Sequence, residues 1–80
     1  MKIPRDLSAV KLVKLLNNLD YFESRQSGSH IRLTRKMASS EHHITIPNHN
    51  PIKLGTLNGI LNDVAGSMNI SKEELLKKLF

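Results

Sequence analysis

The stretch YFESRQSGSHIRLTRKMASSEHHITIP, residues 21–47, decides the fold of this chain. Apolar and polar side chains alternate in residues 29–36 and again in residues 41–47, which is the period of a β-strand with one buried face. The aromatic-led segment 21–26 precedes them as a third predicted strand. Because the loops between these segments are short, we expect an antiparallel meander of three strands.

The two faces of this predicted sheet differ in chemistry. One face is aliphatic and should pack against a core, through Ile31, Leu33, Ile44 and Ile46. The other face is expected to carry toward solvent His30, Arg32, Thr34, His43 and Thr45. A tight hairpin turn is predicted at Ser27-Gly28, so His30 would stand near the start of the second strand.

Three amphipathic segments flank the predicted strands. A serine N-cap begins the first at residues 8–19, and the second spans residues 52–65 with Gly66 expected at its C-terminal end. Ser71 and Glu74 are spaced as a capping box at the start of a short last helix. Helical spacing assigns these residues of the first helix to an apolar stripe: Val10, Leu12, Val13, Leu15, Leu16 and Leu19.

The order of elements (helix, three strands, helix, short helix) predicts an α+β fold in a single domain of residues 1–80. Both longer helices are expected on the apolar face of the three-stranded antiparallel sheet. This is the α-β-β-β-α arrangement of the double-stranded-RNA-binding fold, followed here by a short C-terminal helix.

Composition limits the classes of function. The 80 residues carry a formal charge of +5, which favours an anionic partner such as nucleic acid or an acidic protein. Cysteine is absent from the sequence, so disulfide frameworks and thiolate zinc sites are excluded. The start lacks the apolar core of a signal peptide, and no apolar run approaches the ~20 residues of a membrane span. We therefore expect a cytoplasmic protein with no membrane association.

The run RQSGSH, residues 25–30, carries the strongest chemical signal. The side chain of His30 exchanges a proton near neutral pH, as a general base must. RNA supplies its own nucleophile, the 2′-hydroxyl, so cutting it requires a base and a cation beside the phosphate. His30 is therefore a candidate for the general base of a ribonuclease that uses no metal or organic cofactor. The alternative is an ordinary surface histidine on a solvated strand.

Basic side chains near His30 are the candidates for holding phosphate. Alternation favours Arg32, which shares the face of His30, and Lys53 begins a helix whose N-terminus attracts anions. Gly28 would allow backbone N–H groups to approach a phosphate closely. Any one of these charges could instead serve solubility alone. The predicted RNA contacts are Arg25, Gly28, Ser29, Arg32, Arg35, Lys36, His43 and Lys53.

Three further histidines, His42, His43 and His49, raise the question of a metal site. A regular strand would point His42 and His43 to opposite faces, and Glu41 is the one acid nearby. We therefore predict no metal ligands here. His43 could instead be a second acid–base group, or a stacking partner for an RNA base on the face of His30.

Taken together, these motifs resemble the HicA family of toxins, small mRNA interferases from bacterial toxin–antitoxin pairs. The resemblance covers nearly the whole chain and rests on LDYF (19–22), RQSGSH (25–30), ITIPNH (44–49), LGTL (54–57) and IL (60–61). It implies a double-stranded-RNA-binding-like fold, endonuclease activity on mRNA and neutralisation by a HicB-type antitoxin. The family's catalytic histidine corresponds to His30.

Two other functions remain open at this point. A non-catalytic RNA-binding module of the same fold would hold duplex RNA through phosphate contacts, with steep salt dependence. A protein-interaction domain would use the basic face for an acidic partner. The chain also departs from the family pattern, because Asn58 and Gly59 stand where relatives usually carry a basic residue after Gly-Thr-Leu.

Overall fold

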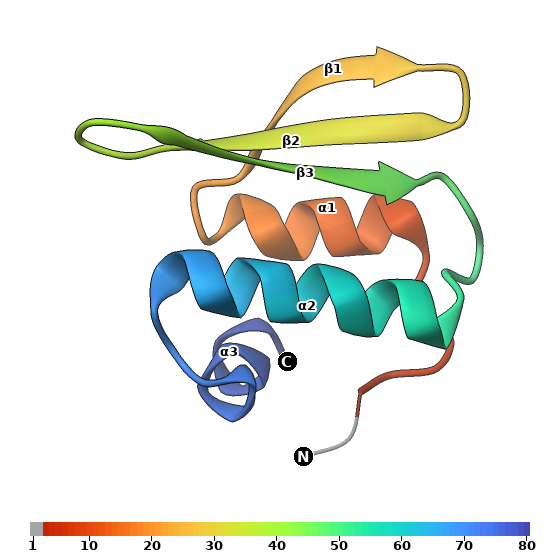
Figure 1. The fold of residues 1–80 in the computed structure, drawn as a ribbon. Coiled ribbons are helices and arrows are strands. Elements are labelled where there is room, and N and C mark those ends of the chain that lie inside the picture. The colour runs from red at the N-terminus through yellow and green to blue at the C-terminus, as the bar shows by residue number, and fades with distance from the viewer. Residues whose placement is uncertain (1–2) are drawn as a thin grey trace.

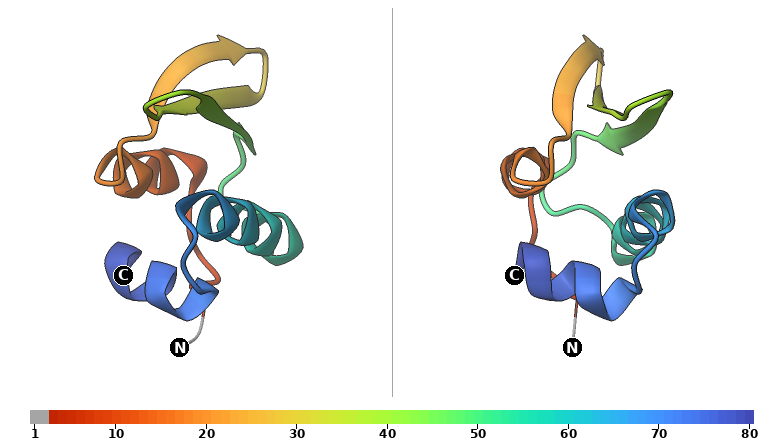
Figure 2. Two further views of the ribbon diagram at one scale, coloured as in Figure 1. Left: turned by 60° about the vertical axis from the view of Figure 1, so that its left-hand side comes forward. Right: turned by 90° about the vertical axis from the view of Figure 1, so that its left-hand side faces the viewer.

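The computed structural model describes residues 3–80 and contains one three-stranded sheet with helices packed on one face. Its elements are α1 (Ala9–Asn17), β1 (Phe22–Ser27), β2 (His30–Lys36), β3 (Glu41–Pro47), α2 (Leu54–Met68) and α3 (Lys72–Leu79). Figures 1 and 2 show α1 and α2 as a layer beneath the sheet, with α3 on the far side of that layer. The predicted α+β, double-stranded-RNA-binding-like arrangement is confirmed. Residues 1 and 2 lie outside the described part. They belong to the predicted domain and to the start of the chain, for which no signal peptide is predicted.

The sheet is the expected antiparallel meander, in the order β1-β2-β3. β3 has its predicted bounds, whereas β1 and β2 each begin one residue later than predicted. Across the sheet, His30 lies opposite Pro47 and Arg32 lies opposite Thr45. β1 carries an irregularity between Glu23 and Arg25, which makes it a bulged edge strand.

The turn between β1 and β2 consists of Gly28 and Ser29, not of Ser27 and Gly28 as predicted. Ser27 instead pairs with His30 and closes a two-residue hairpin. Gly28 has a φ of 57°, and glycine at the first turn position is the pattern of a type II′ hairpin. The correction places His30 directly after the turn.

The two predicted serine N-caps are present. Ser8 Oγ accepts a hydrogen bond from the Lys11 backbone N–H at 3.1 Å. At α3, Ser71 Oγ accepts from the Glu74 backbone N–H at 3.0 Å, and the Ser71 N–H donates to Glu74 Oε1 at 3.3 Å. α1 ends two residues earlier than predicted, because the chain reverses at Asp20, whose φ is 68°.

The end of α2 differs from the prediction. Gly66 does not terminate the helix, which continues to Met68. The left-handed residue is Asn69, with a φ of 57°. The Asn69 N–H donates to Gly66 O at 3.2 Å and the Ile70 N–H donates to Ala65 O at 3.1 Å, which is the Schellman pattern of a helix end. Asparagine tolerates this conformation better than most residues, so a glycine was not required.

The core lies between the sheet and the helices, and its largest fully buried side chain is Tyr21. The apolar stripe predicted for the first helix includes Val10, but this residue is 57% exposed. It lies beside β1, the edge of the sheet, so no further strand covers that flank of the helix. The other large side chains that are fully buried are Leu12, Leu16, Leu33, Ile46, Leu57, Leu61, Val64 and Leu75.

Candidate nucleic-acid interface

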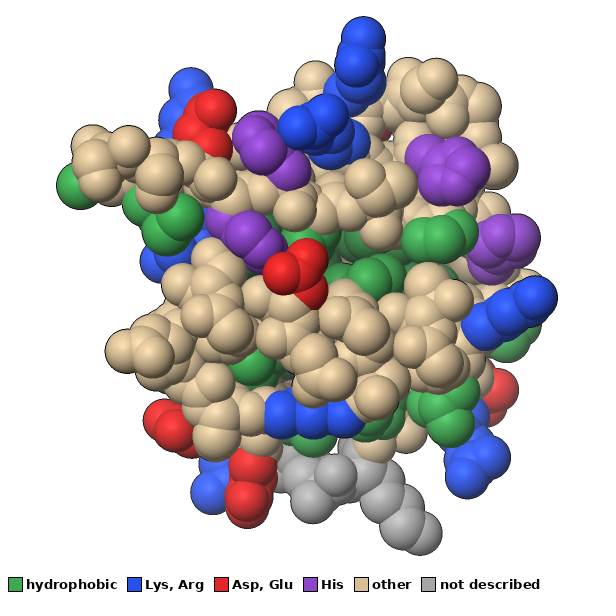
Figure 3. Space-filling view, viewed as in Figure 1, with side chains coloured by type: hydrophobic (Ala, Val, Ile, Leu, Met, Phe, Trp, Pro, Cys, Tyr) green, Lys and Arg blue, Asp and Glu red, His purple; other side chains and the backbone are tan. Residues whose placement is uncertain are grey.

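His30 is presented to solvent at the start of β2, on the face of the sheet away from the helices. The turn that precedes it is held in place, since the Asn48 N–H donates to Ser29 O at 2.6 Å. Figure 1 shows that β2, α1 and α2 all begin at this end of the molecule. Figure 3 shows histidine and basic side chains gathered over the sheet layer and at the same end.

Arg32 shares the outer face with His30, two residues along β2, as alternation predicts. Its cross-strand partner on β1 is Arg25, and both residues are exposed. Like charges directly opposite one another in a sheet are destabilising, and an anion between them would relieve the repulsion. Guanidinium groups also match the geometry of phosphate oxygens. The opposed arginines Arg25 and Arg32, named here the arginine pair, are therefore suited to a phosphate.

Three further predicted contacts lie at the His30 end: Lys53, Gly28 and Ser29. Lys53 directly precedes α2 as its N-cap, and no side chain caps the first turn of that helix. Free backbone N–H groups and the helix dipole favour an anion there. Gly28 and Ser29 are exposed in the turn beside His30. His30 with its turn and Lys53 at the start of α2 therefore lie at one end of the molecule, and the arginine pair lies next to His30 along the sheet.

Arg35 and Lys36 lie away from His30. Arg35 lies on the helix-facing side of β2, where its side chain is half-buried and its Nε has no hydrogen-bond partner among the described residues. Lys36 is on the outer face opposite Glu41, at the other end of the strand. With a rise of ~3.3 Å per residue, Lys36 lies about 20 Å from His30.

A chain of hydrogen bonds crosses all three strands on the outer face. Ser24 Oγ lies 2.8 Å from Thr34 Oγ1, which lies 2.8 Å from His43 Nδ1. His43 Nε2 is 3.9 Å from Glu41 Oε1. His43 lies opposite Thr34, four residues along β2 from His30, or about 13 Å at the rise of a strand. His43 therefore contacts Thr34 rather than His30, and the backbones of the two histidines are well separated.

His42 is the polar residue whose role the sequence analysis did not identify. Its Nδ1 lies 2.7 Å from the Tyr21 hydroxyl and its Nε2 lies 3.1 Å from Asp63 Oδ1. As expected, His42 and His43 occupy opposite faces of β3. Among residues 3–80, no three His, Cys, Asp or Glu side chains gather as metal ligands would. The alternation of residues along β3 predicts that His42 faces the helices, but it does not predict the contacts with Tyr21 and Asp63.

A family model described as "HicA toxin of bacterial toxin-antitoxin" matches residues 10–65. The chain belongs to this family. The match extends from α1 to α2 and includes His30 and the arginine pair, whereas α3 lies outside it. Comparison with curated protein sequences and with solved structures gives no significant match.

Membership in the HicA toxin family has two direct consequences. The protein is the toxin of a toxin–antitoxin system, and such a toxin has an antitoxin partner.

In the described part of this HicA toxin, no helix is long and apolar enough to cross a membrane.

Proposed function

We propose that this toxin is an mRNA interferase, an endoribonuclease that acts in the cytoplasm with His30 as its general base. The observation that carries the proposal is the exposed imidazole of His30 on the same sheet face as the arginine pair. Family membership adds support, because the matched segment includes all three residues.

In the proposed reaction, His30 removes the proton of the RNA 2′-hydroxyl. The resulting oxygen attacks the adjacent phosphorus, and the bond from phosphorus to the 5′-oxygen of the next nucleotide breaks. The 5′-oxygen takes a proton from solvent, which reaches this exposed site. The products are a 2′,3′-cyclic phosphate, which hydrolyses to a 3′-phosphate, and a 5′-hydroxyl. A placed histidine base contributes on the order of 10²–10⁴-fold to such a rate.

The arginine pair would hold the reacting phosphate and stabilise the charge that develops on its oxygens. Arg32 lies closer to His30 along β2, and Arg25 faces it from β1. Lys53 and the first turn of α2 would bind a second phosphate at the same end of the molecule. No step of this reaction requires a metal or an organic cofactor.

The antitoxin of this system is proposed to be a HicB-type protein that covers the outer face of the sheet. The face combines the exposed arginine pair with His30, so an acidic partner surface would neutralise charge and block the base together. Reversing both arginine charges in Arg25→Glu/Arg32→Glu should then weaken antitoxin binding as well as RNA binding. Antitoxin binding that survives this reversal unchanged would show that the partner covers another surface.

Cleavage of a defined mRNA tests the proposal. His30→Ala should lower the cleavage rate by about 10²-fold or more while RNA binding is retained. His49→Ala is the matched control, because His49 is an exposed histidine in the loop before α2 and is given no role in the reaction. Analysis of the product ends should find the cyclic phosphate and the 5′-hydroxyl. Equal cleavage by wild type and His30→Ala would refute His30 as the base.

One observation favours the second candidate, a non-catalytic RNA-binding module. Within residues 3–80, no carboxylate forms a hydrogen bond with the His30 ring, although catalytic histidines are commonly oriented by one. A well-folded wild-type protein that binds RNA at low salt but leaves it intact would establish this alternative.

A further inference from the structure

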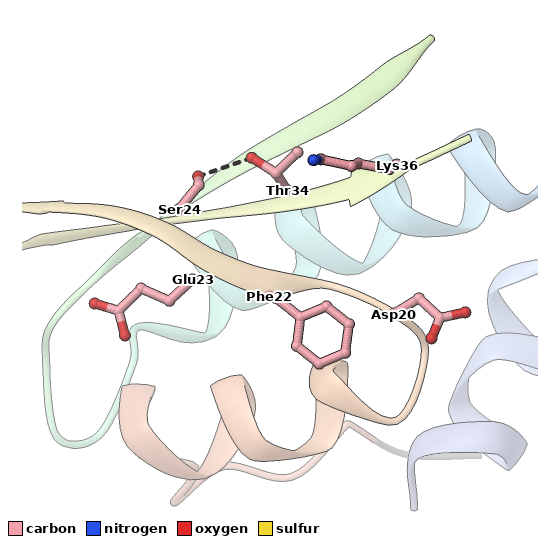
Figure 4. Close-up of a pocket in the computed structure, with 6 residues that line it drawn as sticks. All are labelled: Asp20, Phe22, Glu23, Ser24, Thr34 and Lys36. Carbon is pink, nitrogen blue, oxygen red and sulfur yellow. Dashed lines mark hydrogen bonds between the residues drawn. The ribbon is translucent and has the colours of Figure 1, made fainter. Parts of the chain in front are cut away.

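A pocket at the beginning of β1 has no part in the proposed reaction. Its volume is about 560 Å³, and Figure 4 shows the side chains that line it: Asp20, Phe22, Glu23, Ser24, Thr34 and Lys36. Phe22 is 57% exposed, because its neighbour Tyr21 takes the core position at the start of the strand. An exposed aromatic ring at the edge of such a pocket offers a flat apolar surface to a ligand.

The bulge in β1 puts Phe22 in this position. Without the extra residue at Ser24, regular pairing would continue from Arg25 and place Phe22 opposite Arg35, on the helix side of the sheet. With the bulge, Phe22 is the cross-strand partner of Thr34. Bulges commonly redirect a side chain in this way next to functional sites.

The lining combines the Phe22 ring with hydrogen-bonding groups of several kinds. The hydroxyls of Ser24 and Thr34 lie 2.8 Å apart, and hydroxyls can both donate and accept. The carboxylates of Asp20 and Glu23 only accept, whereas Lys36 only donates. A flat group that stacks on a ring and donates N–H groups from its edge would satisfy this lining. Nucleobases have both features.

The pocket is continuous with the surface around the arginine pair. Ser24, Thr34 and Lys36 also line a shallower pocket of about 360 Å³ over the outer face, to which Arg25 and Arg32 contribute. A phosphate held by the arginine pair would therefore bring the base of an adjacent nucleotide within reach of Phe22. Single-stranded nucleic acid is commonly bound in this way, by a basic groove with aromatic stacking positions.

We propose that this pocket binds one nucleobase of the RNA, stacked on Phe22. This inference rests on the proposed ribonuclease function and extends it to base preference. The carboxylates of Asp20 and Glu23 favour a base with an exocyclic amino group over uracil, which has none. Thr34 lies about 13 Å from His30 along β2, so the bound base belongs to a nucleotide near the cut linkage rather than at it.

The experiment measures the affinity of full-length variants for short labelled oligo-C and oligo-U RNAs. His30→Ala serves as the parent, so that the RNA stays intact. Adding Phe22→Leu should weaken oligo-C binding by about 5- to 150-fold, the range expected for loss of one stacked base. Adding Phe22→Tyr keeps the ring and should restore the affinity of the parent. Val10→Ala is the matched control, because Val10 has the same exposed fraction, 57%, on α1.

The carboxylates have a test of their own. Asp20→Asn/Glu23→Gln should reduce the preference for oligo-C over oligo-U. A carboxylate only accepts hydrogen bonds, whereas the amide that replaces it also donates them and no longer selects a base with an amino group. Three results would overturn the proposal: Phe22→Leu binding as tightly as the parent, Phe22→Tyr binding as weakly as Phe22→Leu, or no preference for oligo-C. Loss of antitoxin binding alone in Phe22→Leu would identify a protein-docking pocket and would also overturn it.

The proposed base pocket and the proposed ribonuclease activity can be refuted separately. RNA binding that depends on Phe22, without cleavage by wild type, would remove the ribonuclease and support the pocket as an RNA contact. Cleavage by wild type, with unchanged affinity and unchanged cut sites in Phe22→Leu, would retain the ribonuclease and overturn the pocket.

Discussion

The hydroxyl of Tyr21 lies 2.7 Å from Nδ1 of His42, between the sheet and the helices. The two rings meet edge to face with centroids 5.7 Å apart. His42 also contacts Asp63 on α2, with Nε2 3.1 Å from Oδ1. With its proton on Nε2, a neutral ring donates to Asp63 and accepts from Tyr21. One histidine on β3 therefore connects the start of β1 to α2.

Removing the Tyr21 hydroxyl should destabilise the fold. We expect Tyr21→Phe to lower the free energy of unfolding by about 1 kcal/mol, because the ring stays buried while one hydrogen bond is lost. Urea unfolding measures this difference. Phe22→Leu is the control, since it changes an exposed neighbouring ring and should alter stability by less than ~0.5 kcal/mol. Equal losses in the two variants would contradict the role given to the Tyr21–His42 contact.

Stability should fall at high pH through Tyr21. Burial raises the pKa of Tyr21 above its ordinary value of 10.0, and it is the largest influence on this group. The folded protein therefore keeps the phenol proton at a pH where the unfolded chain has lost it. This stabilisation is fully present below the unfolded pKa and disappears as the pH rises through the folded pKa. Urea unfolding from about pH 8 to about pH 11 should show a loss in wild type that is smaller in Tyr21→Phe.

Removing one arginine of the pair should weaken RNA binding without weakening the fold. Arg32→Ala should reduce the slope of log affinity against log salt by about one, as expected for one lost phosphate contact. Because Arg25 faces Arg32, the substitution also relieves repulsion between like charges, so stability should be unchanged or slightly higher. Arg5→Ala, at an exposed position before α1, should leave the salt slope as in wild type. An unchanged slope in Arg32→Ala would show that the arginine pair does not contact phosphate.

Two glycine substitutions should change the free energy of unfolding in opposite directions. Gly28→Ala should lower the free energy of unfolding by about 1–2 kcal/mol, because the φ of 57° at this turn is unfavourable for a residue with a Cβ. Gly59→Ala should raise it by about 0.5–1 kcal/mol, since Gly59 is inside α2 and an added Cβ has no heavy atom within 4 Å. Thermal unfolding followed by circular dichroism compares the two. The same sign of change in both would contradict these backbone assignments.

Much of the site followed from alternation along single strands. The outward position of His30 and Arg32 is a property of residue spacing within β2 and needed no knowledge of its neighbours. The prediction of Arg35 as an RNA contact was wrong, because this residue lies on the helix-facing side of the strand. The same local argument failed at the ends of elements. Asn69 rather than Gly66 ends α2, because the residues that follow decide where the chain must turn back toward the core.

The contacts between elements could not be predicted in this way. His42 and Asp63 are 21 residues apart, and nothing in either local pattern relates them. The exposure of Phe22 depends on the bulge at Ser24, which shifts the pairing of β1 by one residue and exchanges the two faces beyond it.

The amino-acid sequence alone determined the order of helices and strands, the serine N-caps of α1 and α3 and the outer face of the sheet. Each of these depends on periodicity or hydrogen bonding within a few residues. Only the tertiary structure decided that Arg25 faces Arg32, that Phe22 is left beside a pocket, and that His42 joins Tyr21 to Asp63. Those relations depend on strand register, on which strand forms the edge, and on packing between segments distant in the chain.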